Sequence, residues 1–240
     1  MPRLHVNIDH VATVRQARRE AFPDPIEFAL RCERAGAVGI TCHLRQDRRH
    51  IQDADVADLR ARIATRLNLE LSLAAEIVAI GTRSGADAFC LVPENRKEVT
   101  TEGGLDVIGE RARLREAVPA LAEQGGEVSL FIDPEPDQIE ASAEVGALFV
   151  ELHTGRYANT TGTEREAELS RLIRAAEKAN ACGLRVNAGH GLDYRNVQPV
   201  VALPHLEELN IGFAIIAEAL FGGVDGAVSG MLELIRTAPG

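Results

Sequence analysis

Eight short apolar runs punctuate this chain of 240 residues, and helical patterns lie between most of them. Each run is bounded by Gly, Pro, Asp or Asn, which is typical of buried β-strands. The strand-like runs are Leu4–Asp9, Val38–Cys42, Leu67–Leu71, Ala88–Val92, Val128–Ile132, Leu148–Leu152, Leu184–Ala188 and Leu206–Ile211. The helical patterns are Pro25–Ala35, Val56–Arg66, Glu76–Ser84, Arg111–Gln124, Pro136–Val145 and Glu164–Cys182. A strand with its helix takes about 30 residues, so a chain of this length accommodates eight such units.

Three of the helical patterns end in the same way. Gly36, Gly85 and Gly146 each precede a strand-like run, the second, fourth and sixth in order. Glycine readily takes the left-handed conformation that ends many helices, so this weak repeat indicates a regularly wound fold. No linker or low-complexity tract divides the chain. We therefore predict one domain over residues 1–240, an α/β fold of the (β/α)₈ TIM-barrel class.

Composition narrows the class of protein. Aromatic residues make up only 4% of the chain, so the core must be aliphatic, which suits parallel strands covered by helices. The net charge of −10 argues against general nucleic-acid binding. No apolar signal segment or bilayer-spanning run is evident, which predicts a soluble cytoplasmic protein with no membrane contact. We expect free thiols in a reducing compartment at the four widely spaced cysteines Cys32, Cys42, Cys90 and Cys182.

Polar side chains gather where the predicted strands end. In a (β/α)₈ barrel the carboxyl ends of the strands form the active face, and nearly every strand here presents an ionisable or amide side chain at that end. These residues are Asn7, Asp9, His10, His43, Glu70, Glu94, Asp133, Glu151, His153, Asn187, His190 and Asn210. A glycine, Gly212, follows the last strand. The pattern therefore predicts an enzyme site at the mouth of the barrel.

Three of these residues are the strongest catalytic candidates. Glu70 lies between Leu69 and Leu71, and a carboxylate buried there must be protonated, paired or held for proton transfer. His43 stands at a strand end, and His190 lies between two glycines that leave room for a substrate. Glu151 and His153 are two apart in a strand and point to one side, so either is a candidate and either can be an anchor of a barrel layer.

The stretch His43–His50 carries a local basic excess in an acidic chain. Together with Arg18, its arginines Arg45, Arg48 and Arg49 suggest room for phosphate groups. Glycines after the last two strands fall where barrels often bind phosphate through backbone N–H groups. The alternative is that the arginines form ion pairs with Asp47 and Asp53. The segment between Pro93 and Asp106 and the segment between Thr154 and Thr163 are long polar connections that suit lids over a site.

Several separated motifs together resemble the pyridoxine 5′-phosphate synthase family along the whole chain. They are Val6-Asn7-Ile8-Asp9-His10, Gly39-Ile40-Thr41-Cys42-His43-Leu44-Arg45, Asp47-Arg48-Arg49-His50, Asn68-Leu69-Glu70, Leu91-Val92-Pro93-Glu94, Glu98-Val99-Thr100-Thr101-Glu102-Gly103-Gly104-Leu105-Asp106, His153-Thr154-Gly155 and Val186-Asn187-Ala188-Gly189-His190-Gly191-Leu192. The resemblance implies a (β/α)₈ barrel with a few extra helices, assembled as a homo-octamer from dimers. It also implies a reaction in vitamin B6 biosynthesis that needs no metal and no organic cofactor.

The resemblance assigns a role to each matching position. The implied reaction condenses 1-deoxy-D-xylulose 5-phosphate with 3-amino-2-oxopropyl phosphate to pyridoxine 5′-phosphate, phosphate and water. His43 and Glu70 match acid–base residues, His190 a proton donor, and Glu151 a residue that stabilises charged intermediates. The family's contacts to the pentulose phosphate correspond to Asp9, His10, Arg45, His50 and Thr100. Its contacts to the amino ketone phosphate correspond to Asn7, Arg18, Gly191 and Gly212. Phe213 departs from the pattern, because the family usually has histidine there, so we expect backbone N–H groups rather than that side chain to hold the phosphate.

Two other functions fit the residues alone. His43, Glu70, Glu151, His153 and His190 are potential ligands of a metal-dependent lyase or hydrolase, although no paired-ligand motif such as His-x-His is present. A sensor of phosphorylated ligands with no catalytic activity is the second alternative. Metal analysis distinguishes a metal-dependent lyase or hydrolase from a cofactor-free enzyme. Turnover of both substrates distinguishes an enzyme from a sensor.

Overall fold

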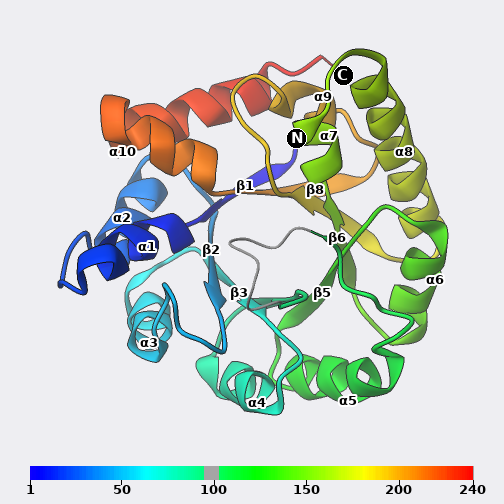
Figure 1. The fold of residues 1–240 in the computed structure, drawn as a ribbon, viewed down its shortest axis with the longest axis horizontal. Coiled ribbons are helices and arrows are strands. Elements are labelled where there is room, and N and C mark those ends of the chain that lie inside the picture. The colour runs from blue at the N-terminus through cyan, green and yellow to red at the C-terminus, as the bar shows by residue number, and fades with distance from the viewer. Residues whose placement is uncertain (95–102, 240) are drawn as a thin grey trace.

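A computed structural model describes residues 1–94 and 103–239, and in it eight parallel strands close into a barrel in chain order, with β8 pairing to β1 (Figure 1). The strands are β1 (Arg3–Asn7), β2 (Gly39–Leu44), β3 (Arg66–Leu71), β4 (Ala88–Leu91), β5 (Glu127–Ile132), β6 (Phe149–His153), β7 (Arg185–Gly189) and β8 (Leu206–Ile211). All eight predicted strands are present, and the predicted barrel is confirmed. Five strands end one or two residues from the predicted position: β1 stops at Asn7, β2 continues to Leu44, β4 stops at Leu91, β6 continues to His153 and β7 continues to Gly189.

Helices form the outer layer of the barrel (Figure 1). They are α1 (Asp9–Arg18), α2 (Pro25–Arg34), α3 (Asp53–Arg62), α4 (Ala75–Ser84), α5 (Arg111–Ala122), α6 (Pro136–Glu144), α7 (Gly155–Asn159), α8 (Gly162–Ala181), α9 (Val197–Val201) and α10 (Phe213–Arg236). The six predicted helices are α2, α3, α4, α5, α6 and α8. The other four helices were not predicted. α1 was missed because it follows β1 at once and because the left-handed residue after it, Arg19, is not a glycine.

The glycine repeat has the predicted conformation. Gly36, Gly85 and Gly146 have φ values of 107°, 67° and 84°, so each takes the left-handed region after its helix. Strand β3 shows the alternation expected of a barrel strand, since Leu67, Leu69 and Leu71 are fully buried in the apolar layer. The residues between them on β3 therefore face the interior of the barrel.

The amino-terminal end of the barrel is closed by ion pairs. The guanidinium of Arg3 donates to Glu208 at 2.6 Å, and Arg185 pairs with Glu207 close by. His5 is fully buried in this floor, where burial lowers its pKa to about 3. A Cβ atom on Gly39 would lie 2.4 Å from the His5 ring, so only glycine fits beside it. The polar residues at the carboxyl ends of the strands lie at the opposite, open end of the barrel.

The last helix is unusually long and apolar. α10 has 24 residues and a window of mean hydropathy 1.4, so by length and composition it is able to cross a bilayer, and the expectation that no segment is long enough was wrong. A single such helix is weak evidence for a membrane span. Gly223 interrupts the helix with a φ of 75°, and the helix packs against α1, α2, α9 and β1. Its buried residues therefore belong to the packing of the barrel.

Candidate active site

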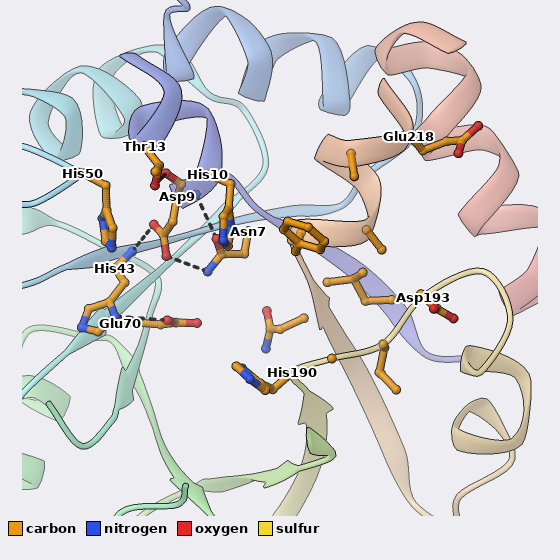
Figure 2. Close-up of a pocket in the computed structure, with 18 of the residues that line it drawn as sticks. Asn7, Asp9, His10, Thr13, His43, His50, Glu70, His190, Asp193 and Glu218 are labelled. Atoms are coloured by element: carbon orange, nitrogen blue, oxygen red, sulfur yellow. Dashed lines mark hydrogen bonds and ion pairs between the residues drawn. The ribbon is translucent and has the colours of Figure 1, made fainter. Parts of the chain in front are cut away.

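A cavity of about 1610 Å³ opens at the carboxyl ends of the strands (Figure 2). Nearly all predicted site residues in the described part of the chain line it: Asn7, Asp9, His10, His43, Arg45, His50, Glu70, Glu151, His190, Gly191, Gly212 and Phe213. They come from β1 to β3, β6 to β8 and the segments that follow these strands. Residues distant in sequence therefore meet because the barrel closes.

His43 and Glu70 are register partners on neighbouring strands β2 and β3. Their side chains share one face, and His43 Nδ1 lies 3.8 Å from Glu70 Oε2 (Figure 2). The backbone N–H of His43 donates to Asp9 Oδ1 at 2.8 Å, which ties β2 to the start of α1. Burial lowers the pKa of His43 well below its ordinary value, and neighbouring His50 and Arg45 act in the same direction. His43 is therefore a neutral imidazole at physiological pH, able to accept a proton.

Two buried glutamates of the cavity, Glu70 and Glu151, have raised pKa values. Burial raises the pKa of Glu70 well above its ordinary value, and the negative charges of Asp9 and Glu151 add to this effect. Burial raises the pKa of Glu151 to about 7, while Asn210 Nδ2, which donates to Glu151 Oε2 at 2.6 Å, opposes the rise. Glu70 is thus suited to donate a proton, and Glu151 changes charge near neutral pH.

His190 is held in a backbone conformation that is uncommon for a residue with a side chain. Its φ is 84°, and Thr154, itself fully buried, donates its hydroxyl to the carbonyl oxygens of Gly189 and His190 at 2.7 and 2.6 Å. Burial lowers the pKa of His190 to about 4, and the nearby rings of His153 and His10 contribute. Such strained residues cluster at functional sites, which agrees with a catalytic assignment.

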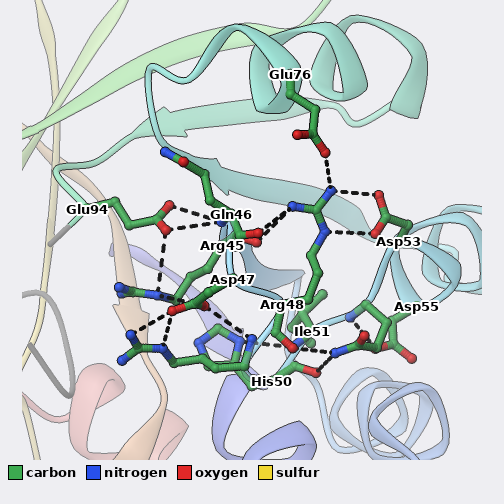
Figure 3. Close-up of polar contacts among 12 residues, drawn as sticks. Arg45, Gln46, Asp47, Arg48, His50, Ile51, Asp53, Asp55, Glu76 and Glu94 are labelled. Atoms are coloured by element: carbon green, nitrogen blue, oxygen red, sulfur yellow. Dashed lines mark hydrogen bonds and ion pairs between the residues drawn. The ribbon is translucent and has the colours of Figure 1, made fainter. Parts of the chain in front are cut away.

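Figure 3 shows the polar contacts of the basic stretch, whose residues divide between the cavity and the surface. Arg45 is buried and lines the cavity, and its Nε lies 3.7 Å from Asp47 and 4.0 Å from Glu94. Arg48 instead bridges Asp53 and Glu76 at 2.8 and 3.0 Å. The ion-pair alternative is therefore confirmed for Arg48 with Asp53, and Arg45 also lies within ion-pair distance of Asp47 while it lines the cavity.

Arg49 combines both behaviours. Its guanidinium lies 2.7 Å from Asp47, which again confirms the ion-pair alternative, yet Arg49 also lines the cavity. Beside it, the His50 ring lines the cavity and accepts a hydrogen bond at Nδ1 from the backbone N–H of Ile51 at 2.9 Å. Arg49 therefore presents positive charge at the cavity wall even though it has a carboxylate partner.

Three sequence candidates lie apart from the cavity or outside the described residues. Arg18 is exposed in the last turn of α1 and does not line the cavity of this chain, so its substrate contact stays a prediction. Thr100 lies outside the described residues. His153 is buried behind the site and its Nδ1 lies 2.9 Å from Asp133 Oδ1, which leaves Glu151 as the member of that pair that faces the cavity.

Sequence reasoning missed the contributions of α1 and α10. Thr13, Gln16 and Ala17 extend the cavity wall along α1, and the spacing of His10, Thr13 and Ala17 was the available signal of one helical face. The α10 residues Ala217, Glu218 and Phe221 form a second wall. Of the segments predicted as lids, the one after Thr154 contains α7, whose buried Tyr157 donates its hydroxyl to the carbonyl of Asn196 at 2.8 Å.

A metal-capable group is present within residues 1–94 and 103–239. Ligand atoms of Asp9, His43 and Glu70 lie within 4.8 Å of one another. This set differs from the predicted ligand group, because it includes Asp9 and excludes Glu151, His153 and His190. A glutamate binds a metal ion in its carboxylate form, whereas burial favours the protonated form of Glu70. A cation bound by this group would therefore have to displace the Glu70 proton.

Comparison with known families decides the assignment. The family model described as pyridoxal phosphate biosynthesis protein PdxJ matches residues 4–237. The chain belongs to this family. Among PdxJ-family relatives, it is 54% identical over 236 residues to the pyridoxine 5′-phosphate synthase of Magnetococcus marinus, covering 98% of this chain and 97% of the relative. It is 56% identical over 237 residues to the synthase of Nostoc sp., covering 98% and 99%.

Solved structures outside the PdxJ family share the fold. KGPDC from Streptococcus mutans superposes with a TM-score of 0.70 at 16% identity and full coverage of both chains. Phosphoribosyl anthranilate isomerase from Thermus thermophilus gives a TM-score of 0.63 at 14% identity, covering 99% of this chain and 100% of the other. At such identities the likeness concerns the barrel alone.

Proposed function

We propose that this chain is a pyridoxine 5′-phosphate synthase that condenses 1-deoxy-D-xylulose 5-phosphate with 3-amino-2-oxopropyl phosphate in vitamin B6 biosynthesis. Membership of the PdxJ family and the names of its curated relatives support this activity. The observation that carries the chemistry is the register pair His43–Glu70, a neutral imidazole 3.8 Å from a carboxyl group that favours its protonated form.

The reaction needs several proton transfers at one place. An amine adds to a ketone, water and phosphate leave, and a carbon–carbon bond closes the ring, so groups must both take and give protons. We assign His43 as a base and Glu70 as its acid partner. We assign His190, whose lowered pKa leaves its imidazole neutral, as a group that takes up a proton during the reaction and donates it to a leaving oxygen. Glu151 stabilises positive charge on intermediates when it is ionised. Each positioned acid or base contributes about 10²–10⁴-fold to the rate.

We assign the two substrate phosphates to different walls of the cavity. Asp9, His10, Arg45 and His50 form the wall proposed to hold the pentulose phosphate, with Thr100 as a further predicted contact. Asn7, Gly191 and Gly212 form the wall proposed for the amino ketone phosphate, with Arg18 as a further predicted contact. The two walls adjoin, because Asn7 Nδ2 donates to Asp9 Oδ2 at 3.0 Å, so the two substrates would lie side by side as a condensation requires.

Phe213 occupies the first position of α10, beside the second of these walls. Its ring lies edge-on to His10 with centroids 5.3 Å apart, and the side chain is 68% exposed. The first N–H groups of a long helix have no partner within the helix and attract anions. We therefore assign the phosphate to the backbone N–H groups that follow Gly212, with which a phenylalanine side chain does not interfere.

Turnover of the two substrates tests the proposed function. Purified protein mixed with both substrates is expected to form pyridoxine 5′-phosphate and to release inorganic phosphate in equal amounts, while either substrate alone is not expected to yield the product. Following both products over time separates an enzyme from a sensor. Binding of both substrates without product would contradict the proposal and support the sensor.

We also propose that the protein acts in the cytoplasm as a homo-octamer built from dimers. Leu220 and Phe221 are 75% and 91% exposed on α10, the helix that also carries the exposed Phe213. Apolar side chains gathered on one helix commonly mark a contact between subunits, and a second copy of this chain is the proposed occupant.

Sedimentation equilibrium tests the assembly. A mass eight times the chain mass of 25.9 kDa is expected, and Leu220→Glu is expected to lower it because a charge cannot be buried there without a partner. Ile173→Glu is the matched control, since Ile173 is a partly exposed apolar residue on α8. A monomer at all concentrations, or an octamer that Leu220→Glu leaves intact, would contradict the proposed interface.

A further inference from the structure

We propose that Thr41 is a positioning residue for the reaction, which acts through Asn210 to orient the donor that holds the Glu151 carboxylate. This inference rests on the role of Glu151 in the proposed function. It extends the site to a residue that does not line the cavity and contacts Glu151 only through another side chain.

Three strands bring the chain of hydrogen bonds together inside the barrel. The Thr41 hydroxyl on β2 donates to Asn210 Oδ1 on β8 at 2.7 Å, and Asn210 Nδ2 donates to Glu151 Oε2 on β6 at 2.6 Å. Thr41 is fully buried, Asn210 is 6% exposed and Glu151 is 3% exposed. Bonds in this environment are shielded from water and therefore act strongly on one another.

The donor and acceptor roles in this chain are mutually consistent. A hydroxyl has one hydrogen to donate and lone pairs to accept, and Asn68 Nδ2 donates to Thr41 Oγ1 at 3.3 Å. Thr41 therefore directs its own hydrogen to the carbonyl oxygen of Asn210. With that oxygen engaged, the amide NH₂ of Asn210 must face Glu151. The reversed amide would set an oxygen against the carboxylate and leave two acceptors without a donor.

The amide orientation determines the charge of Glu151. Burial and the negative charge of Glu208 favour the protonated carboxyl, while the Asn210 donor favours the carboxylate. Cys90 Sγ, 3.7 Å from Glu151 Oε2, is the only other described side chain with a hydrogen bond to this carboxyl group, and a thiol is a weak donor. Asn210 is thus the principal donor, and Thr41 fixes its direction.

The pH dependence of kcat tests this positioning role. Thr41→Val keeps the shape of the side chain and removes the hydroxyl, and Thr41→Ser is the matched control that keeps the hydroxyl. We expect the acidic limb of the kcat profile of Thr41→Val to move about one pH unit upward, since a hydrogen bond to a charged group changes its titration by about this amount. Thr41→Ser is expected to keep the wild-type limb. Thr41→Ala, which introduces no methyl group against the amides, gives the same comparison if Thr41→Val does not fold.

The variant Glu151→Gln separates the positioning role of Thr41 from the role of Glu151 in the reaction. If Glu151→Gln loses turnover and its acidic limb while Thr41→Val keeps the wild-type limb, the positioning role is wrong and the role of Glu151 stands. If Glu151→Gln keeps the wild-type rate and profile, the role of Glu151 is wrong and the inference fails with it. A uniform fall of kcat for Thr41→Val at every pH, with no shift of the limb, also overturns the inference because a purely structural defect has that signature.

Discussion

His43→Asn is expected to remove most of the turnover and to leave the fold intact. The substitution deletes the neutral imidazole that burial keeps available as a base, while the asparagine still carries the backbone N–H that donates to Asp9 Oδ1. Loss of one positioned acid or base reduces kcat by about 10²–10⁴-fold. Circular dichroism and thermal unfolding check the fold, and phosphate release under saturating substrates measures kcat.

His205→Asn is the matched control for this variant. His205 is exposed in the turn before β8, at the floor of the barrel, with a φ of 61° that asparagine tolerates well. It should retain wild-type turnover and stability. Near-normal kcat in His43→Asn would contradict the assignment of His43, and so would a loss of activity that merely follows unfolding of the variant.

Glu70→Gln is expected to have an effect on turnover of similar size. Glutamine keeps the shape of the protonated glutamic acid but cannot release a proton to the neighbouring imidazole. The result should be a fall of kcat by about 10²–10⁴-fold with little change in substrate binding. The kcat and KM values for both substrates are the measurements, and a change confined to KM would show that Glu70 only binds.

The same variant should be more stable than the wild type at neutral and alkaline pH. The pKa of Glu70 is higher in the folded protein than in the unfolded chain, so the folded state binds the proton more tightly. Stability therefore falls as pH rises from the unfolded pKa through the folded pKa. Glu70→Gln removes this loss of stability. The difference in free energy of unfolding between the variant and the wild type, measured with denaturant, should therefore be larger at about pH 8 than at about pH 4. Glu116→Gln, on the exposed face of α5, should show no such pattern and should keep wild-type activity.

Local patterns in the sequence were sufficient to predict the barrel. Strands such as β3 are short apolar runs bounded by turn residues, and Gly36, Gly85 and Gly146 end their helices as glycine allows. Elements without such signals were missed. α1 has no glycine at its end, and α10 follows β8 directly after Gly212 and is kinked at Gly223.

The candidate site was predictable residue by residue, but its internal geometry was not. Polar residues at strand ends indicated the mouth of the barrel because parallel strands end together. The pairing of His43 with Glu70 depends on strand register, and the link from Thr41 through Asn210 to Glu151 joins three strands across the barrel. Short-range patterns carry no information on such contacts. The division of the basic stretch likewise depends on where Asp53 and Glu76 fall in space.

The central claim is that side chains of the PdxJ-family barrel catalyse the condensation by acid–base chemistry, although Asp9, His43 and Glu70 form a group that is able to hold a metal ion. Formation of pyridoxine 5′-phosphate and phosphate from both substrates, measured with a strong chelator and paired with metal analysis of the same sample, tests this claim most directly. We expect undiminished turnover in protein that contains far less than one metal ion per chain. Loss of turnover on chelation, with recovery when a divalent ion is restored, would contradict it.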